Sequence, residues 1–324
     1  MGDHSIMSKI AFFGTPEFAI PSLIKTHDFC SAYGHELLLV VTQPDRPHGR
    51  GFKISKTPVK AKAEELGLLI SQPSSLKRGI KEGDDFYELF KNLKIDLAIV
   101  VAYGAIITKR LLMASNLGFI NIHASLLPKY RGASPIQSAI INGDSYSGIC
   151  LMKMSEKLDE GDVFLREPTM ILPFDTGYSL SLRLSHLGAH ILKNNLSSLI
   201  KNELLAKPQG EGVNYAQKLS KDEGLLNFYS KGKILNRKVR ALDPWPSAYA
   251  FFRGKRIKFF NSFFVPMMFN EVPPATIVAI QPNIGISCID GVIFFEASQI
   301  EGKAIQKSSL VAKSLRLEVG DVID

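Results

Sequence analysis

Two stretches of the chain are apolar at every position, and they constrain the fold more than any other feature. They are Leu37–Val41 (LLLVV) and Leu97–Ala102 (LAIVVA). A strand with one face in water alternates apolar and polar residues, whereas a parallel strand covered by helices on both faces is apolar throughout. These two stretches therefore predict central strands of a parallel sheet.

Further predicted strands alternate with predicted helices along the first half of the chain. The strands are Lys9–Phe13, Leu37–Thr42, Leu68–Ser71, Asp96–Ala102, Phe119–His123 and Ile149–Met154. The helices are Glu17–Thr26, Pro58–Leu66, Phe86–Leu93, Lys109–Ala114, Pro135–Ile141 and Asp175–Leu205. This alternation is typical of a doubly wound, mostly parallel α/β sheet of Rossmann-like type. The first turn, Gly14-Thr15-Pro16, lacks the G-x-G-x-x-G pattern, which disfavours binding of a nicotinamide dinucleotide.

The sequence changes character after the polar stretch Lys207–Gly212. One predicted helix, Gly232–Ala241, is followed by short β-like runs that are separated by turns such as Asp290-Gly291. Such runs predict a small β-barrel of the OB type, a fold that often binds nucleic acid. We therefore expect a catalytic α/β domain over residues 1–206, a linker over 207–229 and a smaller C-terminal β-barrel domain over 230–324.

Composition places the chain among ordinary soluble proteins. Its 324 residues are 45% hydrophobic and 22% charged. No apolar run approaches the roughly 20 residues that a membrane-spanning helix needs, and the start lacks a signal-peptide pattern. The three cysteines, Cys30, Cys150 and Cys288, are far apart, which indicates a reducing compartment. We expect a cytoplasmic protein that does not associate with membranes.

Positive charge is concentrated in two places. The stretch Lys231–Lys258 contains nine basic residues and a single acid, Asp243, and the stretch Arg46–Lys62 contains six basic residues and no acid. The chain as a whole has a net charge of +8. A single basic run is usually a solvated face, but two such runs favour a polyphosphate partner, of which nucleic acid is the commonest large one.

The stretch Gly118–Gly132 (GFINIHASLLPKYRG) combines a strand with a polar pair. Asn121 and His123 are two residues apart, so they project from the same face of the strand. An amide and an imidazole can donate hydrogen bonds or move a proton, whereas a lone histidine is more often a core residue. We expect Asp159, in a Gly-containing turn, to orient the imidazole, although Asp162 fits on composition alone. His186 and His190 have metal-ligand spacing but no third ligand, so we expect no metal site.

Several stretches together resemble the formyltransferases that use 10-formyltetrahydrofolate. The resemblance is closest to those that act on initiator Met-tRNA, because of the basic loop and the basic C-terminal region. It covers most of the chain up to about Pro246, and the Asn-x-His…SLLPxxRG pattern is highly specific. The matching stretches are GTPEFA (Gly14–Ala19), TQPDRPHGRG (Thr42–Gly51), PVK (Pro58–Lys60), VVAYG (Val100–Gly104), NIHASLLPKYRGASPIQ (Asn121–Gln137), LDEGD (Leu158–Asp162), AQKLSKDE (Ala216–Glu223) and RALDPWP (Arg240–Pro246).

The resemblance implies a reaction and a role for particular residues. A formyl group would pass from 10-formyltetrahydrofolate to the α-amine of methionine on initiator Met-tRNA, and no metal would be needed. Asn121, His123 and Asp159 fall on the family's catalytic positions, and Ser125, Leu126, Leu127 and Pro128 on its folate-binding segment, to which we add Tyr103 and Gly104. We expect the tRNA to contact a monomer through Arg46, Arg50, Lys53, Lys56, Lys238, Arg240, Arg253 and Lys255. Two alternatives remain open: an N-formyltransferase that acts on an amino-sugar nucleotide, and a non-catalytic RNA-binding protein.

Overall fold

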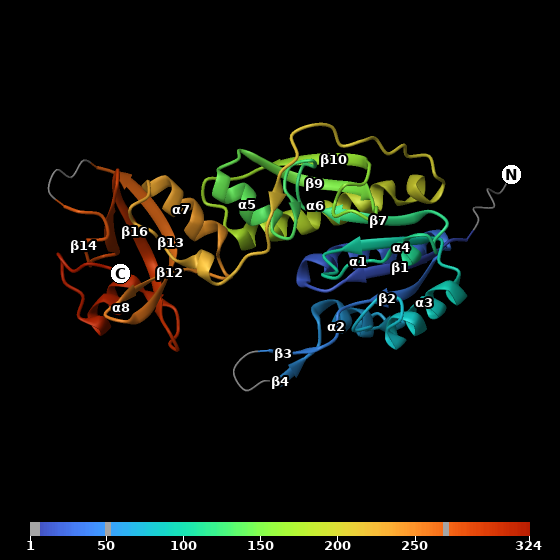
Figure 1. Ribbon diagram of the computed structural model, residues 1–324, viewed down its shortest axis with the longest axis horizontal. Coiled ribbons are helices and arrows are strands. Elements are labelled where there is room, and N and C mark those ends of the chain that lie inside the picture. Colours follow the sequence, from blue (N-terminus) through green and yellow to red (C-terminus); the bar gives the residue numbers. More distant parts are fainter. Residues whose placement is uncertain (1–6, 49–52, 268–271) are drawn as a thin grey trace. The chain divides into compact units, whose positions relative to one another are not determined.

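The computed structural model describes residues 7–48, 53–267 and 272–324. The chain divides into two compact units (Figure 1). The first unit comprises Met1–Gly132, Ser147–Thr169 and Ser181–Tyr215, and the second comprises Ala133–Tyr146, Met170–Leu180 and Ala216–Asp324. The segment up to Tyr215, which sequence assigns to a linker, thus folds with the first unit.

Within the described residues, the first unit is built on a seven-stranded sheet of order β10-β9-β7-β6-β1-β2-β5. The pairs β1–β2, β1–β6, β2–β5 and β6–β7 are parallel, and β9 lies antiparallel to β7. The mostly parallel α/β sheet is therefore confirmed. The strands are β1 (Lys9–Gly14), β2 (Glu36–Val41), β5 (Ile70–Ser71), β6 (Leu97–Val101), β7 (Gly118–His123), β9 (Tyr146–Lys153) and β10 (Val163–Met170).

Helices cover both faces of this sheet, as the apolar strands predict. On one face, Phe86 and Phe90 pack their rings against Phe13, and Phe90 stacks on Phe119 at 5.6 Å between ring centroids. On the other face, Gly188 belongs to α6, and a Cβ at this position would lie 2.9 Å from Ile122. Because glycine has no side chain, α6 can approach β7 closely. The helices are α1 (Ile20–Tyr33), α2 (Pro58–Glu65), α3 (Lys81–Leu93), α4 (Lys109–Leu112) and α6 (Gly177–Ile200), with a 3-10 turn at Glu17–Ala19.

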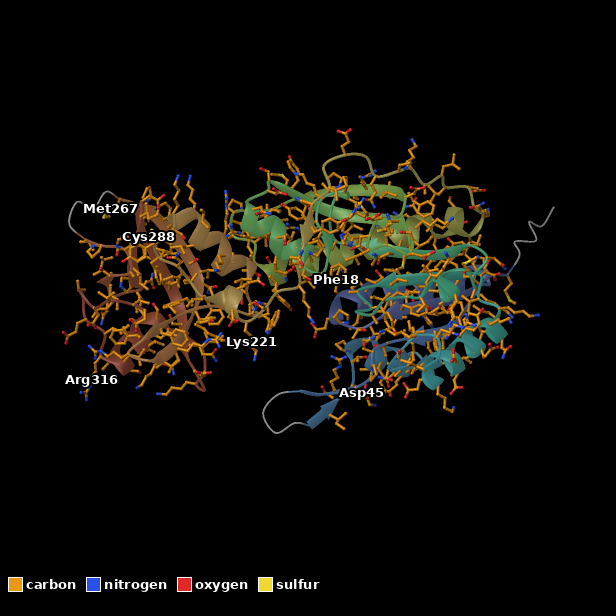
Figure 2. The ribbon with its side chains drawn as sticks, viewed as in Figure 1. Phe18, Asp45, Lys221, Met267, Cys288 and Arg316 are labelled. Carbon is orange, nitrogen blue, oxygen red and sulfur yellow. The ribbon has the colours of Figure 1, made fainter. Side chains whose placement is uncertain are left out.

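Short elements complete the first unit. The strands β3 (Arg46–His48) and β4 (Lys53–Ser55) form an antiparallel hairpin in the basic Gly/Pro loop, where the sequence predicts no strand. Asp45, labelled in Figure 2, lies where the chain enters this hairpin. A further short strand, β8 (Arg131–Gly132), follows the loop after β7.

The second unit contains an antiparallel sheet of order β12-β13-β16-β15-β14, with β17 paired to β16, within the described part of the chain. Its core is formed by apolar side chains such as Phe259, Ile286 and Phe295, together with Leu235 and Val239 of α7. Its elements are α5 (Pro135–Asn142), β11 (Tyr215–Ala216), a 3-10 turn (Asp222–Gly224), α7 (Gly232–Ala241), β12 (Ala248–Phe252), β13 (Lys255–Pro266), β14 (Ile277–Ala279), β15 (Ile284–Cys288), β16 (Gly291–Ile300), β17 (Gln306–Lys307) and α8 (Ser308–Leu315).

The segment Gly320–Asp324 joins the two edge strands of this sheet. Asp324 exchanges two backbone hydrogen bonds with Phe251 of β12, at 2.8 and 3.1 Å. On the opposite edge, Ile277 of β14 donates to the Asp321 carbonyl and accepts from the Gly320 amide, each at 2.8 Å. The sheet is therefore closed by this segment, as a barrel requires, and neither edge is left as an open template for pairing.

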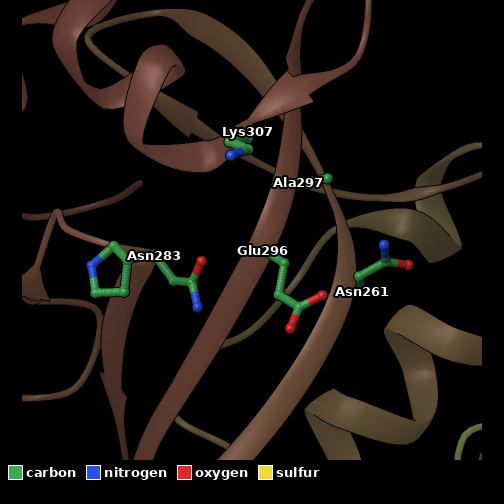
Figure 3. Close-up of a pocket in the computed structure, with 6 residues that line it drawn as sticks. Asn261, Asn283, Glu296, Ala297 and Lys307 are labelled. Carbon is green, nitrogen blue, oxygen red and sulfur yellow. The ribbon is translucent and has the colours of Figure 1, made fainter.

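A depression of about 420 Å³ lies on the second unit (Figure 3). Its charged lining residues are Glu296 of β16 and Lys307 of β17, beside the amides of Asn261 and Asn283. One acid and one base leave the depression without an excess of positive charge, so it is not suited to a polyanion. No helix among the residues that the structure describes has the length and apolar character to span a bilayer.

Candidate active site

The end of β7 places Asn121 and His123 at the carboxyl edge of the sheet. Asn121 lies between Val100 of β6 and Met152 of β9, and His123 lies opposite Cys150 of β9. Both project from the same strand face, as the spacing predicts. The His123 side chain is 7% exposed, whereas Asn121 is half-buried. The pair therefore lies where loops from neighbouring strands can meet it.

One hydrogen bond fixes the orientation of the imidazole. His123 Nε2 lies 2.9 Å from the Tyr130 carbonyl oxygen. A carbonyl only accepts, so Nε2 carries a proton and donates it. The other ring nitrogen, Nδ1, is thereby left as the atom that can exchange a proton with a substrate.

The Asp159 carboxylate faces that second nitrogen. Asp159 Oδ2 lies 3.7 Å from His123 Nδ1 and accepts a hydrogen bond of 2.8 Å from the Gly132 amide. The turn between β9 and β10 presents the carboxylate with Asp159 in a left-handed conformation, at φ +51°. Asp162 is exposed, and its carbonyl accepts from the Lys153 amide. Asp159, rather than Asp162, is the acid that the fold brings to His123.

The segment Ser125–Pro128 is largely committed to the protein's own packing. The Ser125 hydroxyl donates to the Lys129 carbonyl at 2.6 Å, and Leu127 is 1% exposed in a small core with Cys150. Leu127 also donates its amide to Cys150 Sγ, and its carbonyl accepts from Arg166 Nε at 2.8 Å. Of this segment, the half-buried Leu126 and Pro128 are the side chains left to contact a ligand.

Tyr103 and Gly104 line a cavity of about 420 Å³ in the first unit. Burial raises the pKa of the Tyr103 phenol to about 12, although the nearby Gln43 side chain acts in the opposite direction. The hydroxyl oxygen is itself buried and makes no hydrogen bond of ordinary geometry with the described residues. The cavity is lined by Thr15, Pro16, Gln43, Pro44, Arg46, Ser55, Lys56, Thr57, Pro58, Ala102, Tyr103 and Gly104.

The basic residues expected to contact tRNA differ in their environment. In the first unit, Arg46 is exposed, and Lys56 pairs with Glu64 at 2.6 Å, an interaction that raises the pKa of its ammonium group. Arg50 lies outside the described residues, as does the side chain of Lys53.

In the second unit, two of the four expected basic residues are bound to backbone oxygens. Lys238 donates to the Leu225 carbonyl at 2.8 Å, and Arg240 to the Asp175 carbonyl at 2.6 Å. Burial lowers the pKa of both groups. By contrast, Lys255 is exposed, and Arg253 is 65% exposed, 3.4 Å from Asp321. Arg253 and Lys255 are therefore the better placed of the four to meet a phosphate.

Residues that the sequence does not single out hold the site together. The Tyr130 amide donates to the side-chain oxygen of Asn214, and the Arg131 amide donates to the Asn214 carbonyl at 3.0 Å. Gln209 and Arg131 form a second link across the same region. The Pro/Gly setting of Lys207–Gly212 is ordinary loop chemistry, so no local pattern distinguishes Gln209 or Asn214 from linker residues.

Across the part of the chain that is described, no group of three or more His, Cys, Asp and Glu residues has an arrangement that could hold a metal ion. The helical pair His186 and His190 is exposed, and His190 shares a hydrogen bond of 2.9 Å with Asn194.

Comparison with known proteins places this geometry in a family. A family model described as formyl transferase matches residues 8–196, and one described as the C-terminal domain of formyl transferase matches residues 218–316. The chain is 38% identical to the methionyl-tRNA formyltransferase of Dictyoglomus thermophilum over 317 residues, which cover 97% of this chain and 99% of that one. The chain belongs to the methionyl-tRNA formyltransferase family. It is also 39% identical to the relative of that name from Stenotrophomonas maltophilia, over 96% of this chain and 99% of the relative.

Solved structures share the fold at lower identity. HypX from Aquifex aeolicus, in complex with tetrahydrofolic acid, aligns with a TM-score of 0.64 at 18% identity, over 98% of this chain and 49% of that one. The N-formyltransferase from Helicobacter canadensis, in complex with folinic acid and dTDP-3-aminofucose, aligns with a TM-score of 0.67 at 17% identity, over 89% of this chain and 99% of that one.

Proposed function

We propose that this protein transfers the formyl group of 10-formyltetrahydrofolate to the α-amine of methionine on initiator Met-tRNA. The observation that carries the proposal is the buried pair of His123 Nδ1 and Asp159 Oδ2, 3.7 Å apart at the carboxyl end of β7, in a chain of this family. We further propose that it acts in the cytoplasm as a monomer, in keeping with cysteines that are all free.

Residues that follow the carboxyl ends of β6 and β7 suit a folate-derived donor. Leu126 and Pro128 would supply apolar contacts, while the open backbone at Gly104, beside Tyr103, would supply polar ones. A site for a mostly flat, partly polar molecule needs this mixture of apolar wall and a few directed polar groups. When bound, the donor supplies a formyl carbon for the methionine amine to attack, and the formyl oxygen gains negative charge as the bond forms. The bond between that carbon and N10 of the folate would then break, and N10 would take up a proton, which leaves tetrahydrofolate.

The protein's own groups would then act on the amine proton and on that oxygen. His123 Nδ1, which the Asp159 carboxylate faces, is placed to take the proton, directly or through water, because Nε2 is occupied by the Tyr130 carbonyl. The Asn121 amide, on the same strand face, is placed to donate to the oxygen. One such donor is worth about 3–4 kcal/mol in a known oxyanion hole.

Exposed cations would hold the tRNA by its phosphates. Arg253 and Lys255 of the second unit are the strongest candidates, and Arg46 and Lys56 extend the set to the hairpin. Arg50 and Lys53, which neighbour them in sequence, carry the same positive charge and would add to this set. Neutralising several phosphates would make the affinity fall steeply with salt concentration.

A formylation assay tests the proposal. The purified protein should convert initiator Met-tRNA to formyl-Met-tRNA with 10-formyltetrahydrofolate, and His123→Ala should lower kcat by about 10²–10⁴-fold, the range of a general base. His186→Ala, an exposed histidine on α6, serves as the matched control and should leave kcat unchanged. If the protein formylates an amino-sugar nucleotide but not Met-tRNA, the proposed acceptor is wrong and the sugar nucleotide takes its place. Near wild-type turnover by His123→Ala would overturn the assignment of His123 as the group that takes the proton.

A further inference from the structure

Gln209 spans the gap between the Lys207–Tyr215 segment and the turn that carries Asp159. Its side-chain nitrogen, Nε2, lies 2.6 Å from the Asp159 carbonyl oxygen and 2.8 Å from the Gly161 carbonyl oxygen. An amide nitrogen has two hydrogens, so both of them are used on this turn. Gln209 therefore holds the backbone on both sides of Glu160 with one side chain.

The other end of the amide is fixed as well. Gln209 Oε1 accepts from Arg131 Nε at 3.0 Å and from Arg131 Nη2 at 2.9 Å. Arg131 is 8% exposed, and its Nη1 lies 3.2 Å from Glu160 Oε1. A guanidinium only donates and a carbonyl only accepts, so the amide has one allowed orientation between them.

The main chain of Gln209 is anchored independently of its side chain. The Gln209 carbonyl accepts from Arg166 Nη2 at 3.1 Å, and Arg166 Nε donates to the Leu127 carbonyl at 2.8 Å. Lys207, two residues earlier, exchanges backbone hydrogen bonds of 2.8 and 3.0 Å with Val163. Residue 209 thus has a fixed starting point from which its side chain reaches the turn.

The turn needs such support because its conformation is unfavourable on its own. Asp159 is left-handed, at φ +51°, which costs about 1–3 kcal/mol unless the surroundings compensate. In this conformation the carboxylate meets both the Gly132 amide and His123 Nδ1. A relaxed turn would move the carboxylate away from the imidazole while leaving the sheet intact.

We propose that Gln209 is a positioning residue for formyl transfer, and that it acts by holding the Asp159 carboxylate against His123. This inference rests on the proposed function, because it assigns Gln209 to the same catalytic pair. It also implies that the segment Lys207–Tyr215 is part of the active-site scaffold rather than a connection between domains.

The experiment compares Gln209→Glu and Gln209→Met with wild-type protein in the formylation assay. Q209E keeps the contact with Arg131 but turns an acceptor toward two carbonyls, and Q209M keeps the volume without any donor. We expect kcat to fall about 100-fold in each, the effect of a misplacement of about 1 Å, while KM for Met-tRNA stays within a few-fold. Gln217→Glu, an exposed residue of the same region, is the matched control and should behave as wild type.

A double variant separates positioning from general stability. If Gln209 acts through Asp159, adding Q209M to Asp159→Asn should lower kcat little further, whereas independent effects would multiply. Wild-type kcat in both single variants, full multiplication in the double variant, or loss of the fold in both single variants would overturn the proposal. If the wild-type protein itself fails to formylate Met-tRNA, the proposed function fails instead, and the two outcomes are distinct.

Discussion

Gly161 offers a test of how closely the turn between β9 and β10, which carries Asp159, is packed against the sheet. It is buried two residues after Asp159, and a Cβ at this position would fall on the Lys153 carbonyl oxygen, far inside the 3.0 Å that real Cβ atoms keep. The obstructing atom belongs to the backbone of β9, so it cannot swing aside as a flexible side chain would. Gly161→Ala must therefore displace the turn itself.

The size of the effect follows from that displacement. To relieve the overlap, the turn must retreat by on the order of 1 Å, and a misplacement of that size costs about 100-fold in rate. Inserting a methyl group into a packed site also lowers the free energy of unfolding by about 1–3 kcal/mol. We expect both losses together in Gly161→Ala, in the formylation assay and in chemical denaturation.

Gly34→Ala provides the control for a loss of stability alone. Gly34 is left-handed, at φ +71°, with open space around it. It lies just before the amino end of β2, whereas His123 lies at the carboxyl end of β7. Its replacement should cost about 1–2 kcal/mol of stability through backbone strain and leave kcat unchanged. A Gly161→Ala protein with wild-type kcat would refute the argument that the turn cannot move without cost to catalysis.

Two further predictions concern charged groups outside the catalytic pair. Hydrogen bonds from Lys60 and Gln72 lower the pKa of the Asp45 carboxyl from its ordinary 3.8, so the folded protein binds fewer protons there than the unfolded chain. The stability that Asp45 contributes should be complete above pH of about 4 and lost as the pH falls through the lowered value. Urea unfolding of Asp45→Asn across this range should show the difference from wild type shrinking with acid, and a constant difference would contradict it. Arg240→Ala should lower the free energy of unfolding by about 1.5–3 kcal/mol, because it removes a hydrogen bond from a charged group to the Asp175 carbonyl. Arg253→Ala should instead reduce tRNA affinity and its salt dependence, which binding titrations at several salt concentrations would reveal. If Arg240→Ala and Arg253→Ala lowered the free energy of unfolding equally, the two arginines would not have these different roles.

The main strands were predictable because their environment leaves a direct trace in sequence. Leu37–Val41 and Leu97–Ala102 are apolar throughout since helices cover both sheet faces, and both stretches form parallel strands. The closing helix begins at Gly177 rather than Asp175, because Thr176 accepts a hydrogen bond from the Ser179 amide and caps it. The β3–β4 hairpin has no alternation of apolar and polar residues, so periodicity does not reveal it.

The candidate site was predictable only in part, because only some of its residues follow a local sequence pattern. Asn121 and His123 share a face through the two-residue period of a strand, and Asp159 stands out as an acid in a Gly-containing turn. The contacts of Gln209 join it to residues 50 and 78 positions away in the chain. Side-chain hydrogen bonds over such separations follow from the tertiary fold and leave no local pattern.

The closure of the second unit by Gly320–Asp324 has a consequence for the order in which this unit can form. The strands from β12 to β16 pair largely with neighbours in sequence, but the bonds from Asp324 to Phe251 wait until the whole intervening chain has left the ribosome. During synthesis, β14 at Ile277 and β12 at Phe251 therefore lack these partners, although Tyr249 of β12 accepts a hydrogen bond from the Leu226 amide earlier in the chain. Exposed strand edges are where nascent chains associate wrongly. The sheet of the second unit would therefore close after the strands of the first unit have been made, so a newly made molecule can form the strand that carries Asn121 and His123 before its C-terminal sheet is complete.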